Sequence, residues 1–311
     1  MTRIALVTCA AGRSRDDDLL PLLAAIAAHR VGGDAVVAEA VDWDDPDVDW
    51  AVHDLAVVRS TWDYTARYDE FLAWVERCSA ATTLINEPSV LRWNSDKRYL
   101  DELAAAGVRV VPTTFIVPEQ GSPDAPDAHD DFDLPTDVEF VVKPVVSAGS
   151  RDTVRYRVGD HDGAAEQIRG LLGDGRVVMV QPYQQAVDRD GETALLFFGG
   201  RFSHAIRKGQ LLVAGEPATR ALFAEEHITP VQPTDAQLRL AEQCLAALAD
   251  LPAFAGVAQP LPYARVDVLQ ANDGEMSILE LELCEPSLFL EFSDGGAADR
   301  YASVLVALST S

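Results

Sequence analysis

The chain has 311 residues, enough for two domains or for one elaborate domain. It carries 50 acidic and 25 basic residues, and its net charge of −25 argues against nucleic acids and anionic membranes as partners. No apolar run reaches the roughly 20 residues of a membrane helix, and the apolar run at the start is too short for a signal peptide. The four cysteines stand far apart without metal-binding spacing, which indicates free thiols and a cytoplasmic protein.

The first 94 residues alternate between predicted strands and predicted helices. Such alternation is typical of a parallel sheet with right-handed crossovers, so we expect a first α/β domain here. Strands are predicted at 3–10, 34–41 and 54–60, and helices at 16–33 and 68–80.

Polar and aromatic residues follow the strand at 54–60. Ligands of parallel sheets bind beyond the carboxyl ends of the strands. The chain places Arg59, Thr61, Trp62 and Asp63 at this position, and we expect them to contact a substrate. The alternative is a capped turn in which Trp62 packs in the core.

A helix is predicted across 94–110, with Asn94 or Ser95 as its N-cap and Gly107 as its stop. Lys97 near the start of this helix is unfavourable beside the positive end of the helix dipole, which suggests a bound anion. The segment 118–137, rich in Pro, Asp and Gly, is predicted to be a flexible surface loop.

Lys143 stands at the end of an apolar strand within 139–150. A turn of small residues that includes Ser147 and Gly149 follows it. An ammonium beside the N–H groups of such a turn suits phosphate oxygens, so the segment predicts a phosphate site. The alternative is a lysine at a strand end on the surface.

The strand predicted at 176–183 ends in Gln181, Pro182 and Tyr183. A proline leaves backbone groups unpaired, and adenine can use them, with Gln181 accepting from the adenine amino group. A hairpin that turns at Gly199-Gly200 follows, and Arg207 and Lys208 near its end are candidates to steady a reactive phosphate or a substrate carboxylate. The alternative for both is a solvated hairpin end.

Three carboxylates stand on two strands near the end of the chain. Glu280 and Glu282 alternate with leucines, and side chains two apart on a strand share a face, roughly 7 Å apart. Arg265 and Asp267 share a face in the same way. The pattern favours carboxylates that hold Mg²⁺ beside an arginine that neutralises a phosphoryl group. The alternative is an edge strand with a solvated face.

The ordered set of Lys97, Lys143, 181–183, Asp267 and the acids at 280–282 resembles the ATP-grasp superfamily over nearly the whole chain. The resemblance implies an α/β and α+β fold, in which a pre-ATP-grasp α/β domain is followed by two α+β subdomains that grip ATP. We accordingly expect the pre-ATP-grasp domain at 1–94, the lid subdomain with its leading helix at 95–183, and the C-terminal subdomain with the Mg²⁺ site at 184–311.

The same resemblance implies ATP and Mg²⁺ as cofactors and assigns the site residues. ATP would be bound by Lys97, Lys143, Ser147, Gly149, Gln181, Pro182, Tyr183 and Glu192, the last either on the ribose or orienting Lys143. Mg²⁺ would be held by Asp267, Glu280 and Glu282, with Arg265, Lys208 and Arg207 as catalytic residues. The substrate would contact Arg59, Thr61, Trp62, Asp63 and Ser287.

More narrowly, the strings "VVRSTWDY" (57–64), "RWNSDKRYL" (92–100) and "LELELCEPSLFL" (279–290) resemble the O-ureido-D-serine cyclo-ligase group, which makes D-cycloserine. The chain departs from the wider superfamily in places. Its glycine-rich lid loop is reduced to "SAGS", Gln181 replaces a frequent glutamate, and Glu282 stands where many relatives have asparagine.

The resemblance implies Mg·ATP-dependent activation of a carboxylate as an acyl phosphate, followed by carbon–nitrogen bond formation within one small, amino-acid-like molecule in antibiotic biosynthesis. An intermolecular carboxylate–amine ligase, a small-molecule kinase and a non-catalytic ATP-binding regulator are the alternatives. We expect no nucleic acid and no membrane as partner, and we consider a homodimer.

Overall fold

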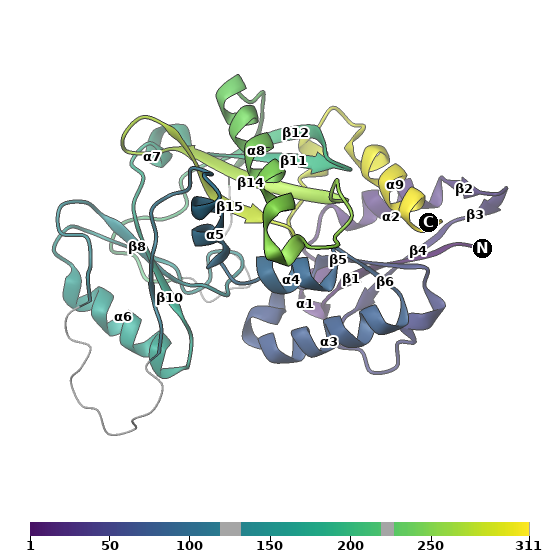
Figure 1. The fold of residues 1–311 in the computed structure, drawn as a ribbon, viewed down its shortest axis with the longest axis horizontal. Helices are drawn as coiled ribbons and strands as arrows, with labels where there is room; N and C mark the ends of the chain where they lie inside the picture. The colour runs from purple at the N-terminus through teal and green to yellow at the C-terminus, as the bar shows by residue number, and fades with distance from the viewer. Residues whose placement is uncertain (119–131, 219–226, 311) are drawn as a thin grey trace.

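The computed structural model describes residues 1–118, 132–218 and 227–310. Most of the surface loop predicted at 118–137 lies outside these described residues. Three sheets make up the body of the molecule, and they lie one after another along its longest dimension (Figure 1). Within the described part of the chain, no helix combines the length and the apolar character needed to cross a bilayer.

The first sheet is parallel, as the sequence predicted, and its strand order is β4-β1-β5-β6. Helix α3 covers it by burying Phe71, Trp74 and Val75, three residues spaced by a helical turn. The strands are β1 (Arg3–Thr8), β4 (Val37–Asp42), β5 (Leu55–Ser60) and β6 (Thr83–Ile85), with a small β2–β3 hairpin (Arg30–Val31, Asp34–Ala35). The helices are α1 (Ala10–Arg13), α2 (Leu19–Ala27), α3 (Tyr68–Ala81) and α4 (Pro88–Asn94), with 3₁₀ turns at Trp50–Val52 and Trp62–Ala66.

The predicted N-cap of the next helix is wrong. Helix α5 spans only Tyr99–Ala105, whereas Asn94 ends α4 and Ser95 follows it. The Asn94 amide instead accepts from the backbone N–H of Leu283 and donates to the carbonyl of Leu281, so its capping groups are used by another strand. Gly107 has a φ of +82°, which fits the predicted stop.

The second sheet is antiparallel, with order β7-β10-β8-β9. Helix α6 (His161–Gly173) covers one face, where Ile168 packs with Phe140 and Val178 in one apolar cluster. The strands are β7 (Thr114–Ile116), β8 (Phe140–Pro144), β9 (Val154–Tyr156) and β10 (Val178–Pro182).

The third sheet is antiparallel, with order β13-β12-β11-β14-β15. The predicted hairpin is confirmed, because Phe198 pairs with Arg201 around Gly199 and Gly200, whose φ values are +54° and +72°. The strands are β11 (Glu192–Phe198), β12 (Arg201–Lys208), β13 (Ile228–Val231), β14 (Tyr263–Gln270) and β15 (Met276–Glu282). Helix α7 (Val187–Asp190) precedes them, α8 (Asp235–Ala247) lies between β13 and β14, and 3₁₀ turns occupy Leu248–Asp250, Pro252–Phe254 and Leu290–Phe292.

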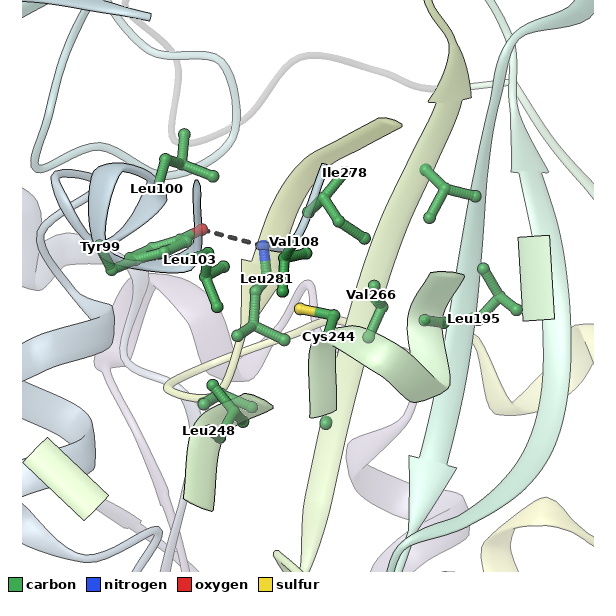
Figure 2. Close-up of a cluster of buried hydrophobic side chains, with 14 of the residues drawn as sticks. Tyr99, Leu100, Leu103, Val108, Leu195, Cys244, Leu248, Val266, Ile278 and Leu281 are labelled. Atoms are coloured by element: carbon green, nitrogen blue, oxygen red, sulfur yellow. Dashed lines mark hydrogen bonds between the residues drawn. The ribbon is translucent and has the colours of Figure 1, made fainter. Parts of the chain in front are cut away.

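Two helices pack away from the segment in which they were expected. Helix α5, grouped by sequence with the lid, packs on the third sheet: Tyr99 and Leu103 join Leu281 in one cluster, and the Tyr99 hydroxyl accepts from the Leu281 N–H at 2.9 Å (Figure 2). Helix α9 (Ala297–Leu308) returns to lie beside α2 at the first sheet, where Tyr301 is fully buried (Figure 1). Both helices connect the sheets around the site described next.

Candidate active site

A cavity of about 610 Å³ lies where the three sheets meet. Its lining combines the carboxyl end of β5, the strands β8 and β10, and the strands β12, β14 and β15. The predicted site residues that line it are Trp62, Lys97, Lys143, Ser147, Gly149, Gln181, Pro182, Tyr183, Glu192, Lys208, Arg265, Glu280, Glu282 and Ser287.

The charged end of the cavity is built by register. On the antiparallel pair β14–β15, Arg265 is opposite Glu282 and Asp267 is opposite Glu280, so four charged side chains share one face. Arg265 forms ion pairs with Asp267, at 2.9 Å from Nε to Oδ1, and with Glu282. The Asp267 carboxylate also accepts from Lys208 Nζ at 2.5 Å.

Two further lysines reach this face from the other side of the cavity. Lys97 Nζ lies 3.0 Å from Glu280 Oε1 and donates to the Ser147 carbonyl at 2.7 Å. Lys143 projects from β8 into the same space, and within the described residues its ammonium makes no hydrogen bond or ion pair. A half-buried cation without such a partner, beside a small-residue turn, suits an incoming phosphate.

The acids differ in how well their charge is compensated. Burial by itself raises the pKa of the Asp267 carboxyl, but Arg265 and Lys208 outweigh it and lower that pKa. For Glu280, Lys97 and Lys143 likewise overcome burial and lower the pKa. For Glu282, the effect of burial is larger than the opposing effect of the Arg265 charge, and the pKa of the carboxyl is raised to about 8. Glu282 is therefore the carboxylate that gains most from another cation.

The lysines show the complementary pattern. Burial would lower the pKa of Lys97, but the charge and hydrogen bond of Glu280, together with the charges of Glu282 and Glu285, raise it. Burial does lower the pKa of Lys143, although Glu280 opposes the shift. Lys143 is thus the cation that a bound anion would stabilise most.

The opposite end of the cavity is apolar. Val111, Val141, Tyr183 and Leu269 form one cluster there, and all four line the cavity. Tyr183 follows the last residue of β10, Pro182, at the segment predicted to bind adenine. The Gln181 side chain donates to the Thr113 hydroxyl at 2.9 Å, so its carbonyl oxygen is the group left for a ligand.

The segment that follows β5 of the first sheet closes a third side of the cavity. The Trp62 indole donates to the Glu285 carbonyl at 3.1 Å, and Tyr64 and Ser287 also line this side. Glu285 faces the Tyr64 hydroxyl, and burial raises the pKa of the Glu285 carboxyl.

Besides Asp267, whose oxygens Arg265 and Lys208 engage, four predicted site residues do not line the cavity. Arg59 is fully buried and donates to the Pro286 carbonyl at 2.9 Å, with Asp16 and Asp18 at 3.5 and 3.6 Å. Thr61 is also fully buried. The others that do not line it are Asp63, which accepts from the Trp43 indole at 2.9 Å, and Arg207, which is exposed on β12 one residue before Lys208. Their predicted contacts with substrate or phosphate have no support from these positions.

Several lining residues were missed by the sequence reasoning. Asp18 accepts from the backbone N–H groups of Leu288, Phe289 and Leu290 at 2.6 to 3.1 Å, and so holds the segment that carries Ser287. In the sequence, the acids at 16–18 read as the start of a helix. No local signal indicated a partner about 270 residues away, whereas Glu285 could have been found from its place just after β15.

The residues present fit a divalent cation in part. Glu280 and Glu282 both line the cavity and share a face, which is a suitable pair of oxygen ligands. Asp267 is 1% exposed and its oxygens are engaged by Arg265 and Lys208. Among the described residues, no group of three or more acidic, histidine or cysteine side chains is arranged to hold a metal.

The arrangement of sheets around this cavity is the ATP-grasp fold. A solved D-alanine–D-alanine ligase from Bacillus anthracis, complexed with ATP, superposes with a TM-score of 0.59 at 13% identity over 100% of this chain and 98% of that one. The chain belongs to the D-cycloserine synthetase (DcsG) family. Residues 4–86 match the family described as the N-terminal domain of D-cycloserine synthetase DcsG.

Two relatives carry the family assignment. The cycloserine biosynthesis protein DcsG of Streptomyces lavendulae is 42% identical over 307 residues, with 97% of each chain covered. The crystal structure of D-cycloserine synthetase DcsG matches with a TM-score of 0.83 at 38% identity, covering 99% of both chains. The predictions of an ATP-grasp fold and of a carbon–nitrogen ligase are confirmed, and a non-catalytic regulator is not supported.

Proposed function

We propose that this enzyme uses Mg·ATP to activate the carboxylate of a small amino-acid-like substrate and then closes a ring through a nitrogen of the same molecule, as in the conversion of O-ureido-D-serine to D-cycloserine. The observation that carries the proposal is the cavity itself. It joins an apolar slot at Tyr183 to a set of lysines and paired acids, and then to a side closed by the first domain.

The apolar slot would bind adenine. Its apolar walls at Val111, Val141 and Leu269 suit a flat ring, and the strand end at Pro182 offers backbone groups. Glu192 also lines the cavity, with 3.9 Å separating Glu192 Oε2 from Lys208 Nζ. We assign the ribose to Glu192.

The lysines would hold the phosphates. Lys97 and Lys143 enter from one side of the cavity, with the turn of Ser147 and Gly149 beside them. A carboxylate is a poor electrophile, and phosphorylation gives it a good leaving group. Lys208 and Arg265, held by Asp267, would stabilise the charge that develops during phosphoryl transfer.

Glu280 and Glu282 would hold Mg²⁺, with Asp267 joining them once Lys208 or Arg265 turns to an incoming phosphate. The bound ion supplies Lewis-acid neutralisation of phosphate oxygens. The chain's own part is to keep Glu280 ionised, which Lys97 and Lys143 do by lowering the pKa of its carboxyl.

The substrate would lie between the charged face and the first domain. Trp62 and Ser287 line this space and are the substrate contacts that we retain from the sequence. With the nucleophilic nitrogen in the same molecule as the acyl phosphate, the effective concentration of the nucleophile is built in. An intermolecular ligase with a separate amine is the second candidate.

The four cysteines are buried and unpaired, which supports action in a reducing cytoplasm. The homodimer stays a prediction.

The test is an ADP-release assay with ATP, Mg²⁺ and O-ureido-D-serine as the single organic substrate, followed by product mass spectrometry. We expect ADP and the cyclised product to form together. Release of ADP only after a separate amine is added would favour the intermolecular ligase. A stable phosphorylated product would indicate a kinase.

A further inference from the structure

Arg155 on β9 is a buried arginine that does not line the cavity. Its side chain is 8% exposed, and its guanidinium carbon lies 3.5 Å from the centroid of the Tyr183 ring. It donates to two acids, to Glu139 at 2.8 Å from Nε and to Asp188 at 2.8 and 3.0 Å from Nη1 and Nη2. A guanidinium fixed by two carboxylates and stacked on a ring has little freedom to move.

These partners belong to different parts of the molecule. Arg155 and Glu139 lie in or beside the second sheet, whereas Asp188 lies in α7, which leads into the third sheet. Arg155 Nη1 also donates to the Leu212 carbonyl at 3.3 Å, and the backbone carbonyl of Arg155 accepts from the Gly215 N–H at 3.0 Å. Arg155 therefore joins the second sheet both to α7 and to the segment that follows β12.

The groups that Arg155 holds are themselves in the cavity wall. Tyr183 and Leu212 line the apolar slot, and the Tyr183 hydroxyl donates to Asp188 at 2.5 Å. One face of the Tyr183 ring is thus covered by Arg155 while its edge is tied to the same acid that binds Arg155. Moving the second sheet away from α7 would break these contacts together.

We propose that Arg155 is a positioning residue that keeps the second sheet closed over the nucleotide by fixing Tyr183 and the segment at Leu212. This inference rests on the proposed function, because it assigns the slot at Tyr183 to adenine. Closure also excludes water from the acyl phosphate. In an open site, water would compete with the internal nitrogen for the acyl phosphate, and ATP would be consumed without ring closure.

The experiment compares Arg155→Met with Arg155→Lys and with Arg189→Met. Arg189 is the matched control, since it lies in α7 next to Asp188 with a side chain 74% exposed. For Arg155→Met we expect the KM for ATP to rise about tenfold while kcat falls less than about threefold, the pattern of lost ground-state binding. The ratio of ADP released to ring product should rise above one. For Arg155→Lys, the KM for ATP and the ratio of ADP to ring product should lie between those of wild type and Arg155→Met. Lysine keeps the positive charge but lacks the planar guanidinium that binds two carboxylates at once.

The inference would be overturned if Arg155→Met had the same KM for ATP and the same ratio of ADP to ring product as wild type. If that variant does not fold, Asp188→Asn replaces it, because the Asp188 side chain is 38% exposed and the amide can still accept from Tyr183. Asp188→Asn should shift both readouts in the same direction, and no shift would count against the inference.

If the wild-type enzyme releases no ADP with the substrate, the proposed function fails on its own. The Kd for ATP of Arg155→Met, measured by calorimetry, then still tests the role of Arg155, with a wild-type value overturning it.

Discussion

The Lys208 ammonium lies 2.5 Å from Oδ2 of Asp267, across the intervening strand β11 of the third sheet. Arg265 donates to both oxygens of the same carboxylate. From the sequence, Asp267 was expected to hold Mg²⁺ together with Glu280 and Glu282. In the structure, Asp267 is the counter-ion of two buried cations, so neutralising it should lower the stability of the fold.

We predict that Asp267→Asn lowers the free energy of unfolding by about 3 kcal/mol in the absence of metal, because it leaves two buried cations short of a counter-charge. ADP formation should be lost as well, since Lys208 and Arg265 would no longer be held. Urea unfolding with EDTA present measures the stability, and the exposed Asp273→Asn serves as control. An unchanged or higher stability for Asp267→Asn would contradict the counter-ion role.

Glu282 should respond in the opposite way. Burial raises the pKa of this carboxyl to about 8, so Glu282→Gln should hold or raise the melting temperature without metal. In the wild type, saturating Mg·ADP should raise the melting temperature by several degrees, and ADP with excess EDTA much less. Glu280→Gln and Glu282→Gln should each lose most of this Mg²⁺-dependent increment. If nucleotide stabilises wild type equally with and without Mg²⁺, these acids do not bind the nucleotide's metal.

Lys143 should matter for ATP affinity far more than a surface cation does. We expect Lys143→Met to raise the Kd for ATP about tenfold or more, because a charge-assisted bond to phosphate is lost. Arg207→Ala should change it less than about twofold, since Arg207 is exposed on the opposite face of β12 from Lys208. Calorimetric titration ranks the two variants, and the reverse order would place the phosphates elsewhere.

His204 should make stability depend on pH below neutrality. Burial lowers the pKa of His204, with Arg300 adding to the shift while its bond to the Leu288 carbonyl and the charge of Asp18 oppose it. Just below the unfolded pKa of about 6.5, His204 therefore binds a proton in the unfolded chain but not in the folded chain. Stability from this group is present above about pH 6.5 and is lost as pH falls through the lower folded pKa.

In His204→Gln, the loss of stability between pH 7.5 and 5.5 should therefore be smaller than in wild type, by up to about 1.4 kcal/mol per pH unit. Urea unfolding at the two values gives the comparison. Equal losses in both proteins would show that His204 does not carry the proton linkage.

The sequence predicted those features that depend on local periodicity. Alternation alone placed Glu280 and Glu282 on one face, and two glycines with positive φ marked the β11–β12 turn. It failed where a side chain serves a partner far along the chain. Asn94 looked like a helix cap but bonds to β15, and Arg59 looked like a substrate contact but bonds to the carbonyl of Pro286, 227 residues away.

The hydrogen bonds from the backbone of residues 288–290 to Asp18 limit which segments of this enzyme can be exchanged with those of a related ligase. The first sheet looks like a detachable module, and exchanging residues 1–94 for those of another ligase is an obvious way to alter which compound is accepted. Such a chimera would separate the acid from the three N–H groups that it holds, and Arg59 from the carbonyl of Pro286. The unit of exchange is therefore the first domain together with residues 286–290, two stretches at opposite ends of the chain that form a single wall of the cavity.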